Sequence, residues 1–439
     1  MIKTILKAGF KISILVGFAI CVALFASKLT RPQSYPEADN TKEKVDGFYA
    51  LKDNSIDVLG IGTSHLYSAL NPGVFAYYTG LSSYDFAGQC QPMEVTYHYL
   101  VEALKTQDPQ LVVLDIFALS HEATACQVPG AYRTSIQDLK ASTNKLEAYK
   151  NMFDHTVMEN FFDVSLYANR LPYLDFANAQ DIFEHQKNDY FGYTPVLPYS
   201  DIIWDREAFV ADSSVEPPER RLQAFLKIVA LCQSEEIPLL VIKTPYYISQ
   251  EDANIYRYIW DYCEQNAINY IDFNYLSDEL NYQYELDGDL WHATVPGSYK
   301  ITAYLAQFIT NNYQLEPSHN YEQAYDELYF GTLQMIFKTN KHYYRLKEYI
   351  DYFDVTVLIS DRDHWFSEDH RHLVYKKGTI YPDRYVAYQE NSVEIKEDNS
   401  VWYNGENVYG PNDEFLMIVV DDMSGKIVDI VNIANLKME

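Results

Sequence analysis

Hydrophobic and polar positions along this chain predict short buried strands separated by helices. Short runs rich in apolar and aromatic residues predict strands at residues 56–62, 83–87, 109–116, 237–243 and 268–273. Apolar residues three and four positions apart predict helices after them, at residues 93–106, 220–234, 251–266 and 297–311. Strands that alternate with helices form parallel sheets, so we expect an α/β fold with a doubly wound parallel sheet.

Changes in this pattern predict the other parts of the chain. Residues 130–200 interrupt the alternation with helical spacing and many aromatic residues, which predicts a helical insertion, either a lid or an ordinary helical cap. Strand patterns at 354–360, 385–388, 401–403, 415–420 and 427–433 predict a smaller α+β module. The expected organisation is a signal anchor at 1–29, a linker at 30–47, the sheet domain at 48–316 and the C-terminal module at 317–439.

The N-terminus predicts a membrane anchor. Three lysines precede the sixteen uncharged residues from Ile12 to Ser27, and no Ala-x-Ala cleavage site follows them. This favours an uncleaved signal anchor over a cleaved signal peptide. We therefore expect a single-pass protein of the cell membrane with the bulk of its chain outside the cytoplasm.

Composition narrows the classes of partner. A formal net charge of −28 argues against nucleic acid and against a basic membrane-binding surface. The 40 tyrosines suit sugar contacts, although tyrosine is also an ordinary strand residue. No C-x-x-C pair or dinucleotide-binding motif occurs, and the His/Asp-rich run at 361–372 is typical of a solvated acidic loop. No metal or cofactor is expected, and the disulfide state of the scattered cysteines stays open.

The candidate chemistry lies at the end of the first strand. Ser64 follows Gly62-Thr63, where a strand ends and a helix begins, so we expect it at the carboxyl edge of the sheet, where α/β domains bind ligands. Asp289-x-x-His292 stands before the last helix of the domain. Its carboxylate can orient the imidazole that removes the serine proton. The alternatives are that Ser64 is a helix N-cap and His292 a loop histidine. His65 is expected to be at most a pocket residue.

Together these two motifs resemble the SGNH (GDSL-like) hydrolase superfamily. The closer likeness is to its membrane-anchored branch, whose members acylate polysaccharides and teichoic acids of the cell envelope. The resemblance covers about residues 50–312 and implies a flavodoxin-like, SGNH-like sheet with Ser64, Asp289 and His292 as catalytic residues.

The resemblance also implies an oxyanion hole. In the family a glycine after the second strand donates a backbone N–H, and that glycine is Gly88 here. An asparagine usually follows the third strand, but here the chain reads Asp115-Ile116-Phe117-Ala118. Gln89 or Gln91 is the expected substitute. The Thr244–Tyr247 stretch follows another strand and is expected to line the acyl or sugar pocket.

The expected function is acyl transfer, of O-acetyl or a similar group, to a surface polysaccharide or teichoic-acid-like polymer. The resemblance implies that a multipass membrane acyltransferase delivers the acyl group. A carbohydrate esterase of the same fold and a non-catalytic glycan-binding envelope protein are the alternatives. Pieces of the C-terminal module at 356–363, 384–388 and 419–428 resemble, in permuted order, the interleukin-like domain of inducers of epithelial–mesenchymal transition. That likeness implies a carbohydrate-binding or protein-docking module.

Overall fold

The chain divides into two compact units, residues 1–325 and 326–439. The computed structural model describes residues 2–30, 41–126, 129–153, 188–197, 210–276, 280, 291–317, 323–339, 343–360, 371–381, 393–412 and 415–432. The prediction placed the division after Glu316. The ring of Tyr325 stacks on Phe191 at 4.0 Å and its hydroxyl donates to the Ser83 carbonyl, so the chain stays with the first unit up to that tyrosine.

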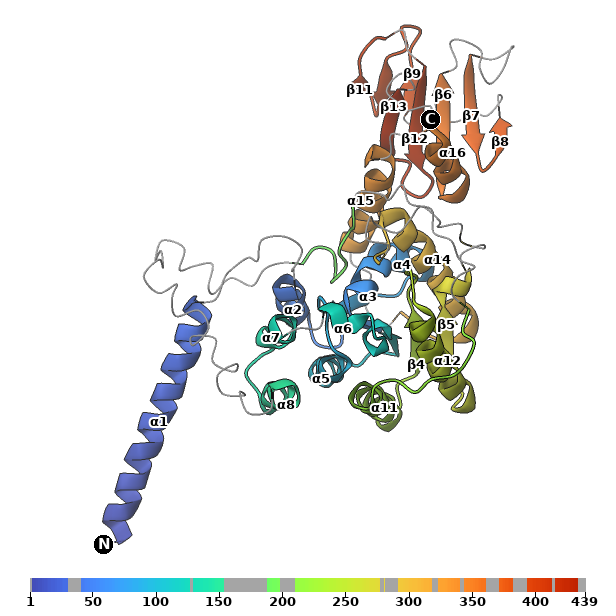
Figure 1. The fold of residues 1–439 in the computed structure, drawn as a ribbon. Helices are drawn as coiled ribbons and strands as arrows, with labels where there is room; N and C mark the ends of the chain where they lie inside the picture. Colours follow the sequence, from blue (N-terminus) through green and yellow to red (C-terminus); the bar gives the residue numbers. More distant parts are fainter. Residues whose placement is uncertain are drawn as a thin grey trace. The chain divides into compact units, whose positions relative to one another are not determined.

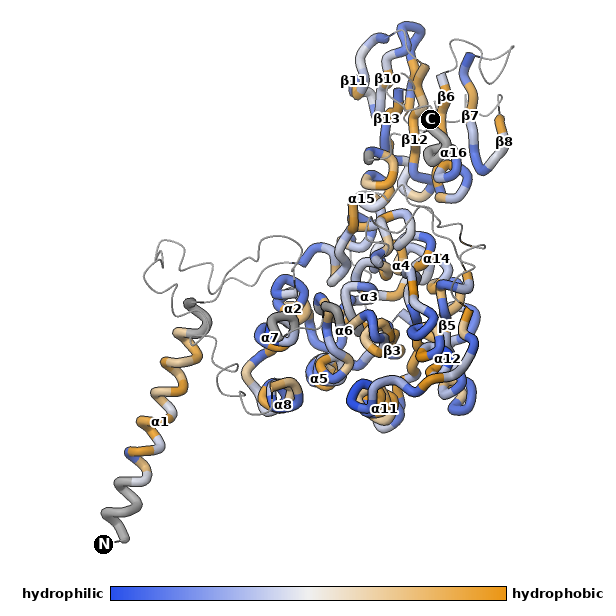
Figure 2. The backbone as a smooth tube through the Cα atoms, in the orientation of Figure 1, coloured by the Kyte–Doolittle hydropathy of each residue, from blue (hydrophilic) through white to orange (hydrophobic). Residues whose placement is uncertain are grey.

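The N-terminal helix α1 (Ile2–Thr30) is long and apolar enough to cross a membrane. Its most hydrophobic stretch is Gly9–Ala26, and none of that stretch is buried against the rest of the protein. Hydrophobic residues dominate its described part (Figure 2). Length and composition therefore agree with the predicted membrane-associated segment.

A five-stranded parallel sheet forms the centre of the first unit, which confirms the predicted α/β class. Its strands are β1 (Val58–Gly62), β2 (Ser83–Ala87), β3 (Leu111–Asp115), β4 (Leu239–Lys243) and β5 (Asn269–Asp272). Their order is β2-β1-β3-β4-β5, with every neighbouring pair parallel. Figure 1 labels β4 and β5 of this sheet, with the helix α12 beside them. The chain leaves β1 in one direction and returns on its other side, so the strand order reverses at β1. Ligands of open α/β sheets bind at such a reversal.

Helices lie on both faces of this sheet. On one face, α3 (Ser64–Ala69), α4 (Pro72–Thr79) and α14 (Val295–Asn312) contact one another. On the other face, α5 (Met93–Ala103) contacts α11 (Glu219–Ser234), which contacts α12 (Gln250–Gln265) through Phe225 and Tyr262. Side chains alternate between the two faces of the sheet along β2. Asp85 shares the α3 face with Gly60 and Leu66, whereas Phe86 meets Tyr99 of α5.

The linker prediction is wrong for residues 41–47, because these belong to α2 (Thr41–Ala50). The Phe48 ring stacks on Phe86 of β2 at 4.0 Å, and the Tyr84 hydroxyl donates to the Lys44 carbonyl at 2.6 Å. These contacts fix α2 on the edge strand, so Thr41–Ala50 is part of the folded unit. The remainder of the predicted linker, residues 31–40, lies outside the described residues.

The predicted helical insertion is described in part. It contains α7 (Pro129–Gln137) and α8 (Thr143–Phe153), and α8 packs on α5. The expected helices at 158–162 and 166–174 lie outside the described residues. The segment 188–197 pairs with three elements in turn. Phe191 accepts from Asp85 N in β2, Thr194 N donates to Tyr67 in α3, and Val196 accepts from Val295 N at the start of α14.

The C-terminal unit is built of antiparallel sheets, as its α+β pattern suggests. The division at Tyr325 falls inside α15 (Gln323–Thr339), and α16 (Tyr343–Tyr352) follows. One sheet has the order β13-β12-β6-β7-β8 and the other β11-β10-β9. The strands are β6 (Val355–Ser360), β7 (His372–Lys376), β8 (Thr379–Tyr381), β9 (Val393–Ile395), β10 (Val401–Tyr403), β11 (Glu406–Tyr409), β12 (Leu416–Asp421) and β13 (Ile427–Asn432).

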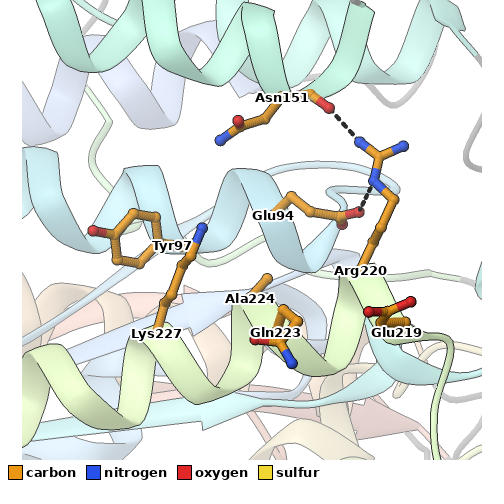
Figure 3. A pocket seen from close by; sticks show the side chains of 8 residues that line it. All are labelled: Glu94, Tyr97, Asn151, Glu219, Arg220, Gln223, Ala224 and Lys227. Atoms are coloured by element: carbon orange, nitrogen blue, oxygen red, sulfur yellow. Dashed lines mark hydrogen bonds and ion pairs between the residues drawn. The ribbon is translucent and has the colours of Figure 1, made fainter.

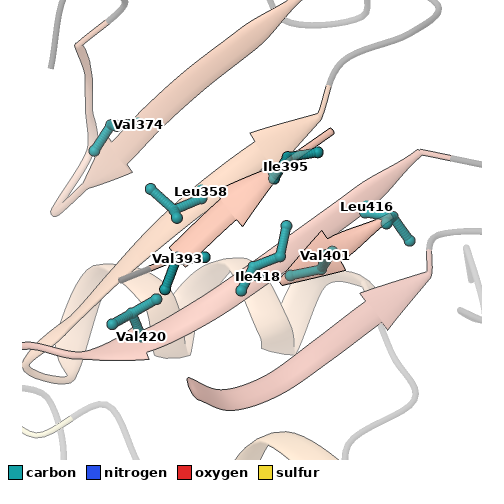
Figure 4. Close-up of a cluster of buried hydrophobic side chains, with 8 residues drawn as sticks. All are labelled: Leu358, Val374, Val393, Ile395, Val401, Leu416, Ile418 and Val420. Carbon is teal, nitrogen blue, oxygen red and sulfur yellow. The ribbon is translucent and has the colours of Figure 1, made fainter. Parts of the chain in front are cut away.

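Side chains from both of these sheets form one hydrophobic core. Leu358 of β6, Val374 of β7 and Ile418 of β12 meet Val393 and Val401 from the smaller sheet (Figure 4). Every residue of β6 and β12 is buried, so both faces of the larger sheet are covered at its centre. The predicted strand at 385–388, which carries part of the C-terminal resemblance, lies outside the described residues.

Candidate active site

Ser64 is the first residue of α3, directly after β1 and the capping residue. The cap is Thr63, whose side chain accepts a hydrogen bond from His65 N at 3.2 Å. The alternative that Ser64 itself caps the helix is therefore wrong, and its hydroxyl is left for another partner. Gly62 allows β3 to approach closely here, because a Cβ on it would lie 2.9 Å from the Asp115 Cβ.

That partner is His292, which lies 228 residues further along the chain. Its Nε2 is 2.9 Å from Ser64 Oγ. His292 is held just before α14, whose N-cap is Thr294, although the threonine side chain makes no capping hydrogen bond. The structure thus brings two of the three predicted catalytic residues together. The third, Asp289, lies outside the described residues.

Aromatic rings surround this pair. His65 is buried, stacks on Phe117 at 3.6 Å with an interplanar angle of 17°, and lies 4.9 Å from the His292 ring. Tyr246 and Trp291 lie 5.2 and 6.3 Å from the His65 ring. Tyr246 comes from the Thr244–Tyr247 stretch that the sequence placed at this edge. His65 is therefore packed among aromatic rings beside His292, the histidine that contacts Ser64.

The expected oxyanion residues follow β2 in a crowded turn. A Cβ on Gly88 would lie 2.8 Å from Gln91 Oε1, so a larger residue there would require the Gln91 side chain to shift. The Gln91 side chain is buried and its Nε2 donates to Thr96 Oγ1 in α5 at 3.0 Å. The Gln89 N–H donates to Thr41 Oγ1 in α2 at 3.4 Å. The Gln91 amide and the Gln89 backbone N–H are thus both engaged in contacts with neighbouring helices.

Asp115, at the end of β3, was not singled out by the sequence pattern. Its carboxylate is fully buried and accepts hydrogen bonds from the Thr63 hydroxyl (3.4 Å), Phe117 N (3.4 Å) and the Thr244 hydroxyl (3.1 Å). Burial raises the pKa of Asp115 to about 6, although these hydrogen bonds act in the opposite direction. One side chain therefore joins the ends of β1, β3 and β4 beside Ser64.

A second buried polar group supports the turn that carries Tyr246, whose ring packs beside His65. The Lys243 ammonium, at the end of β4, donates to Asp272 Oδ1 at 3.3 Å and to Asn274 Oδ1. Asn274 Nδ2 in turn donates to the Tyr246 carbonyl at 2.8 Å. Burial lowers the pKa of Lys243, and the adjacent Asp272 carboxylate opposes that shift. The ion pair thus holds the turn that places Tyr246 against His65.

Within the described part of the chain, no three His, Cys, Asp or Glu side chains are grouped closely enough to hold a metal ion. Residues 361–370 of the His/Asp-rich run lie outside that part. Cys90 is disulfide-bonded, whereas Cys232 and Cys263 are buried free thiols. No protein-family model matches this sequence, and a comparison with curated proteins finds no significant match.

Proposed function

We propose that this protein is a serine-dependent acyl-transfer enzyme of the cell envelope, with Ser64 as nucleophile and His292 as general base. One observation carries the proposal: Ser64 Oγ and His292 Nε2 lie 2.9 Å apart, although 228 residues separate them in the chain. This is the distance at which an imidazole can take a hydroxyl proton. A serine that serves only as a helix cap would need no such partner.

The chemistry follows from these two atoms. Neutral Nε2 of His292 takes the Ser64 proton as Oγ bonds to the acyl carbonyl carbon of a donor ester, forming a tetrahedral intermediate. The intermediate collapses to an acyl-serine, and the imidazolium returns the proton to the leaving alcohol. A sugar hydroxyl then gives its proton to Nε2 as its oxygen attacks the acyl-serine carbonyl carbon. The new tetrahedral intermediate collapses to the acylated sugar, the bond from the carbonyl carbon to Ser64 Oγ breaks, and the imidazolium returns the proton to Oγ. Water in place of the sugar gives the esterase reaction.

The start of α3 suits the negative charge that develops on the intermediate. The backbone N–H groups of His65, Leu66 and Tyr67 donate to Thr63. The Ser64 N–H is therefore the first-turn donor that we assign to the oxyanion. Gly88 N–H is the second donor in this proposal. The Gln91 amide donates to Thr96, so we assign no oxyanion contact to that glutamine.

The strand order supports a doubly wound, flavodoxin-like domain of SGNH type. Ser64 follows the strand at which the order β2-β1-β3-β4-β5 reverses, and His292 precedes the last helix of the unit. Where the family carries an asparagine after the third strand, this chain has a buried aspartate at the end of that strand. Asp115 contacts Thr63 rather than serving as an amide donor.

The anchor and the cysteines support a place outside the cytoplasm. The helix α1 can span a membrane by length and composition, and Cys90 is disulfide-bonded. Disulfides persist mainly in oxidising compartments. We therefore propose that α1 holds the chain at the outer face of the cell membrane, near a multipass acyltransferase that supplies acyl groups.

The packing of rings around Ser64 favours a small acyl group such as acetyl. Ser64 is only 6% exposed, and His65, Phe117, Tyr246 and Trp291 contact one another beside it at 3.6–6.3 Å between ring centroids. Aromatic faces also suit the apolar side of a sugar ring. A surface polysaccharide or teichoic-acid-like polymer is therefore the proposed acceptor.

The direct test is covalent labelling. Full-length protein in detergent is treated with a fluorophosphonate probe, and the modified peptide is identified by mass spectrometry. We expect labelling at Ser64 and none in Ser64→Ala. The matched control is Ser68→Ala, which removes another buried serine of α3 and should label like the wild type. Equal labelling of Ser64→Ala would exclude Ser64 as the nucleophile.

Transfer and hydrolysis are separated by a second measurement. In this experiment, unlabelled wild-type protein is incubated with p-nitrophenyl acetate and an oligosaccharide acceptor. The amounts of acetylated oligosaccharide and of free acetate that form are then compared. Acetyl-oligosaccharide that disappears in Ser64→Ala supports transfer. Free acetate alone, unchanged by any acceptor, supports the esterase.

A further inference from the structure

A cavity of about 320 Å³ lies between three helices, α5, α8 and α11, and none of its lining residues belongs to the Ser64–His292 site. Figure 3 shows Glu94 and Tyr97 on α5, with Asn151 on one side and Arg220, Gln223 and Lys227 on the other. We call it the three-helix pocket. Its volume is at the lower end of the range for small-molecule sites, about 300–1,000 Å³.

The polar wall of this pocket is held in place before any ligand binds. Arg220 Nε lies 3.7 Å from Glu94 Oε1, and its Nη2 donates to the Asn151 carbonyl. The Asn151 side chain donates from Nδ2 to Nε2 of the buried His98 at 2.9 Å. These contacts reduce the ordering cost that a ligand would otherwise meet.

His98 is itself fixed in one tautomer. Its Nδ1 lies 2.7 Å from Asn144 Oδ1, and Asn144 Nδ2 donates to the His98 carbonyl and to Glu102 Oε2. Since Oδ1 faces Nδ1, the ring carries its proton on Nδ1 and accepts on Nε2. A chain of buried hydrogen bonds therefore sets the orientation of the Asn151 amide at the pocket.

The lining chemistry identifies the class of ligand. Two carboxylates, Glu94 and Glu219, balance two cations, Arg220 and Lys227, so the pocket has no net charge to favour an anion or a cation. Carboxylate, guanidinium and amide groups together supply both acceptors and donors. Each sugar hydroxyl is at once a donor and an acceptor, and neutral sugars need both kinds of group.

The Tyr97 ring supplies the remaining element of a sugar site. It is half-buried on α5, and Lys227 Nζ stands 5.8 Å from its centroid. An aromatic ring can pack on the apolar C–H face of a sugar while polar groups bond its hydroxyls. We propose that the three-helix pocket binds one or two units of a neutral saccharide. This binding does not depend on the chemistry assigned to Ser64.

The test measures saccharide binding by saturation-transfer NMR on full-length protein, in a detergent without a sugar head group. The probes are maltotriose, mannotriose and chitotriose, with inorganic phosphate as the anionic comparison. We expect at least one trisaccharide to bind. Gln223→Ala should weaken that binding about fivefold through loss of a hydrogen bond, and Tyr97→Ala roughly tenfold through loss of the ring contact.

Matched control variants test whether the loss of binding is specific to the residues of the pocket. Gln233→Ala removes an exposed glutamine from the same helix, and Tyr258→Ala a half-buried tyrosine from α12, so both should bind like the wild type. Ser64→Ala should also bind normally, whatever its effect on acyl transfer. The proposal is overturned if no trisaccharide binds, if phosphate alone binds, or if Gln223→Ala and Tyr97→Ala, shown to be folded by circular dichroism, bind sugar as the wild type does.

Discussion

The buried carboxylate of Asp115 accepts a hydrogen bond from the hydroxyl of Thr63, the residue directly before Ser64, at 3.4 Å. Its other oxygen accepts from the Thr244 hydroxyl. One carboxylate therefore joins the end of β1, just before Ser64, to the end of β4, just before Tyr246. Since a buried carboxylate costs free energy when ionised, this link makes the stability of the site depend on pH.

Asp115→Asn should flatten the pH dependence of unfolding. Burial raises the pKa of Asp115 from about 3.8 to about 6, so the folded protein binds this proton more tightly than the unfolded chain. The contribution to stability is full below about pH 4 and is lost as pH rises through 6. Two pKa units correspond to about 3 kcal/mol. Urea denaturation of both proteins between pH 4 and 7.5 measures it.

The control for this experiment is Asp108→Asn, which changes an exposed aspartate near the start of β3. It should keep the wild-type pH profile. An Asp115→Asn profile that falls between pH 4 and 6 as steeply as the wild type would assign the titration to another group.

His292→Ala should lower kcat/KM for p-nitrophenyl acetate about a thousandfold or more, because the base and the nucleophile act as a unit. The fold should be unchanged, since the residue precedes α14 rather than lying in its packed interior. The comparison is His121→Ala, a surface histidine with 46% side-chain exposure. Comparable activity in the two variants would show that the 2.9 Å contact has no part in the reaction.

Lys243→Met should destabilise the protein by about 3–5 kcal/mol, the usual cost of leaving one member of a buried ion pair without its partner. Lys243 is fully buried and Asp272 nearly so. Adding Asp272→Asn should recover part of the loss, because the uncompensated charge is gone. Arg257→Met breaks the exposed pair with Asp261 and should cost less than about 1 kcal/mol in the same denaturation experiment.

Gly192→Ala tests the segment that joins β2 to the start of α14. Gly192 has φ +88°, and a Cβ there would lie 2.1 Å from the Asp85 carbonyl oxygen. We expect a large fall in Tm, together with lower esterase activity as the segment shifts near His292. Gly80→Ala has a similar φ of +71° but its nearest neighbour is 3.8 Å away, so it should cost only about 1–2 kcal/mol. Equal losses would mean that the clash is relieved elsewhere.

The strands of the sheet could be predicted because the hydrophobic pattern that defines each strand lies within a few consecutive residues. Buried runs such as Leu111–Asp115 and Leu239–Lys243 are apolar up to their last residue, which is typical of central parallel strands. Ser64 and His292 could be predicted for a related reason, since each stands at a recognisable junction of strand or loop with helix. Their pairing was predicted from the Asp-x-x-His motif and from the resemblance to the SGNH superfamily.

The features that were not predicted depend on contacts between residues that are far apart in the sequence. The α2 sequence is mostly polar, and its helix is stabilised by Phe48 stacking on Phe86, 38 positions away in the sequence. Asp115 meets Thr63 and Thr244, which are 52 and 129 residues away. Thr63-Ser64 offers two capping residues in the sequence, and the hydrogen bond from His65 N to the Thr63 side chain decides between them.

Because α2 belongs to the folded unit, only residues 31–40 connect that unit to α1. Ten residues reach at most about 36 Å when fully extended, at about 3.6 Å per residue. Under the proposed function, with α1 in a bilayer and Ser64 as the nucleophile, Ser64 would search a thin layer above the membrane instead of the whole surrounding volume. A donor presented in the same membrane then meets it at an effective concentration on the order of millimolar. Weak intrinsic affinity for the donor is enough under those conditions, and an assay with a freely dissolved donor would register only a fraction of the rate at the membrane.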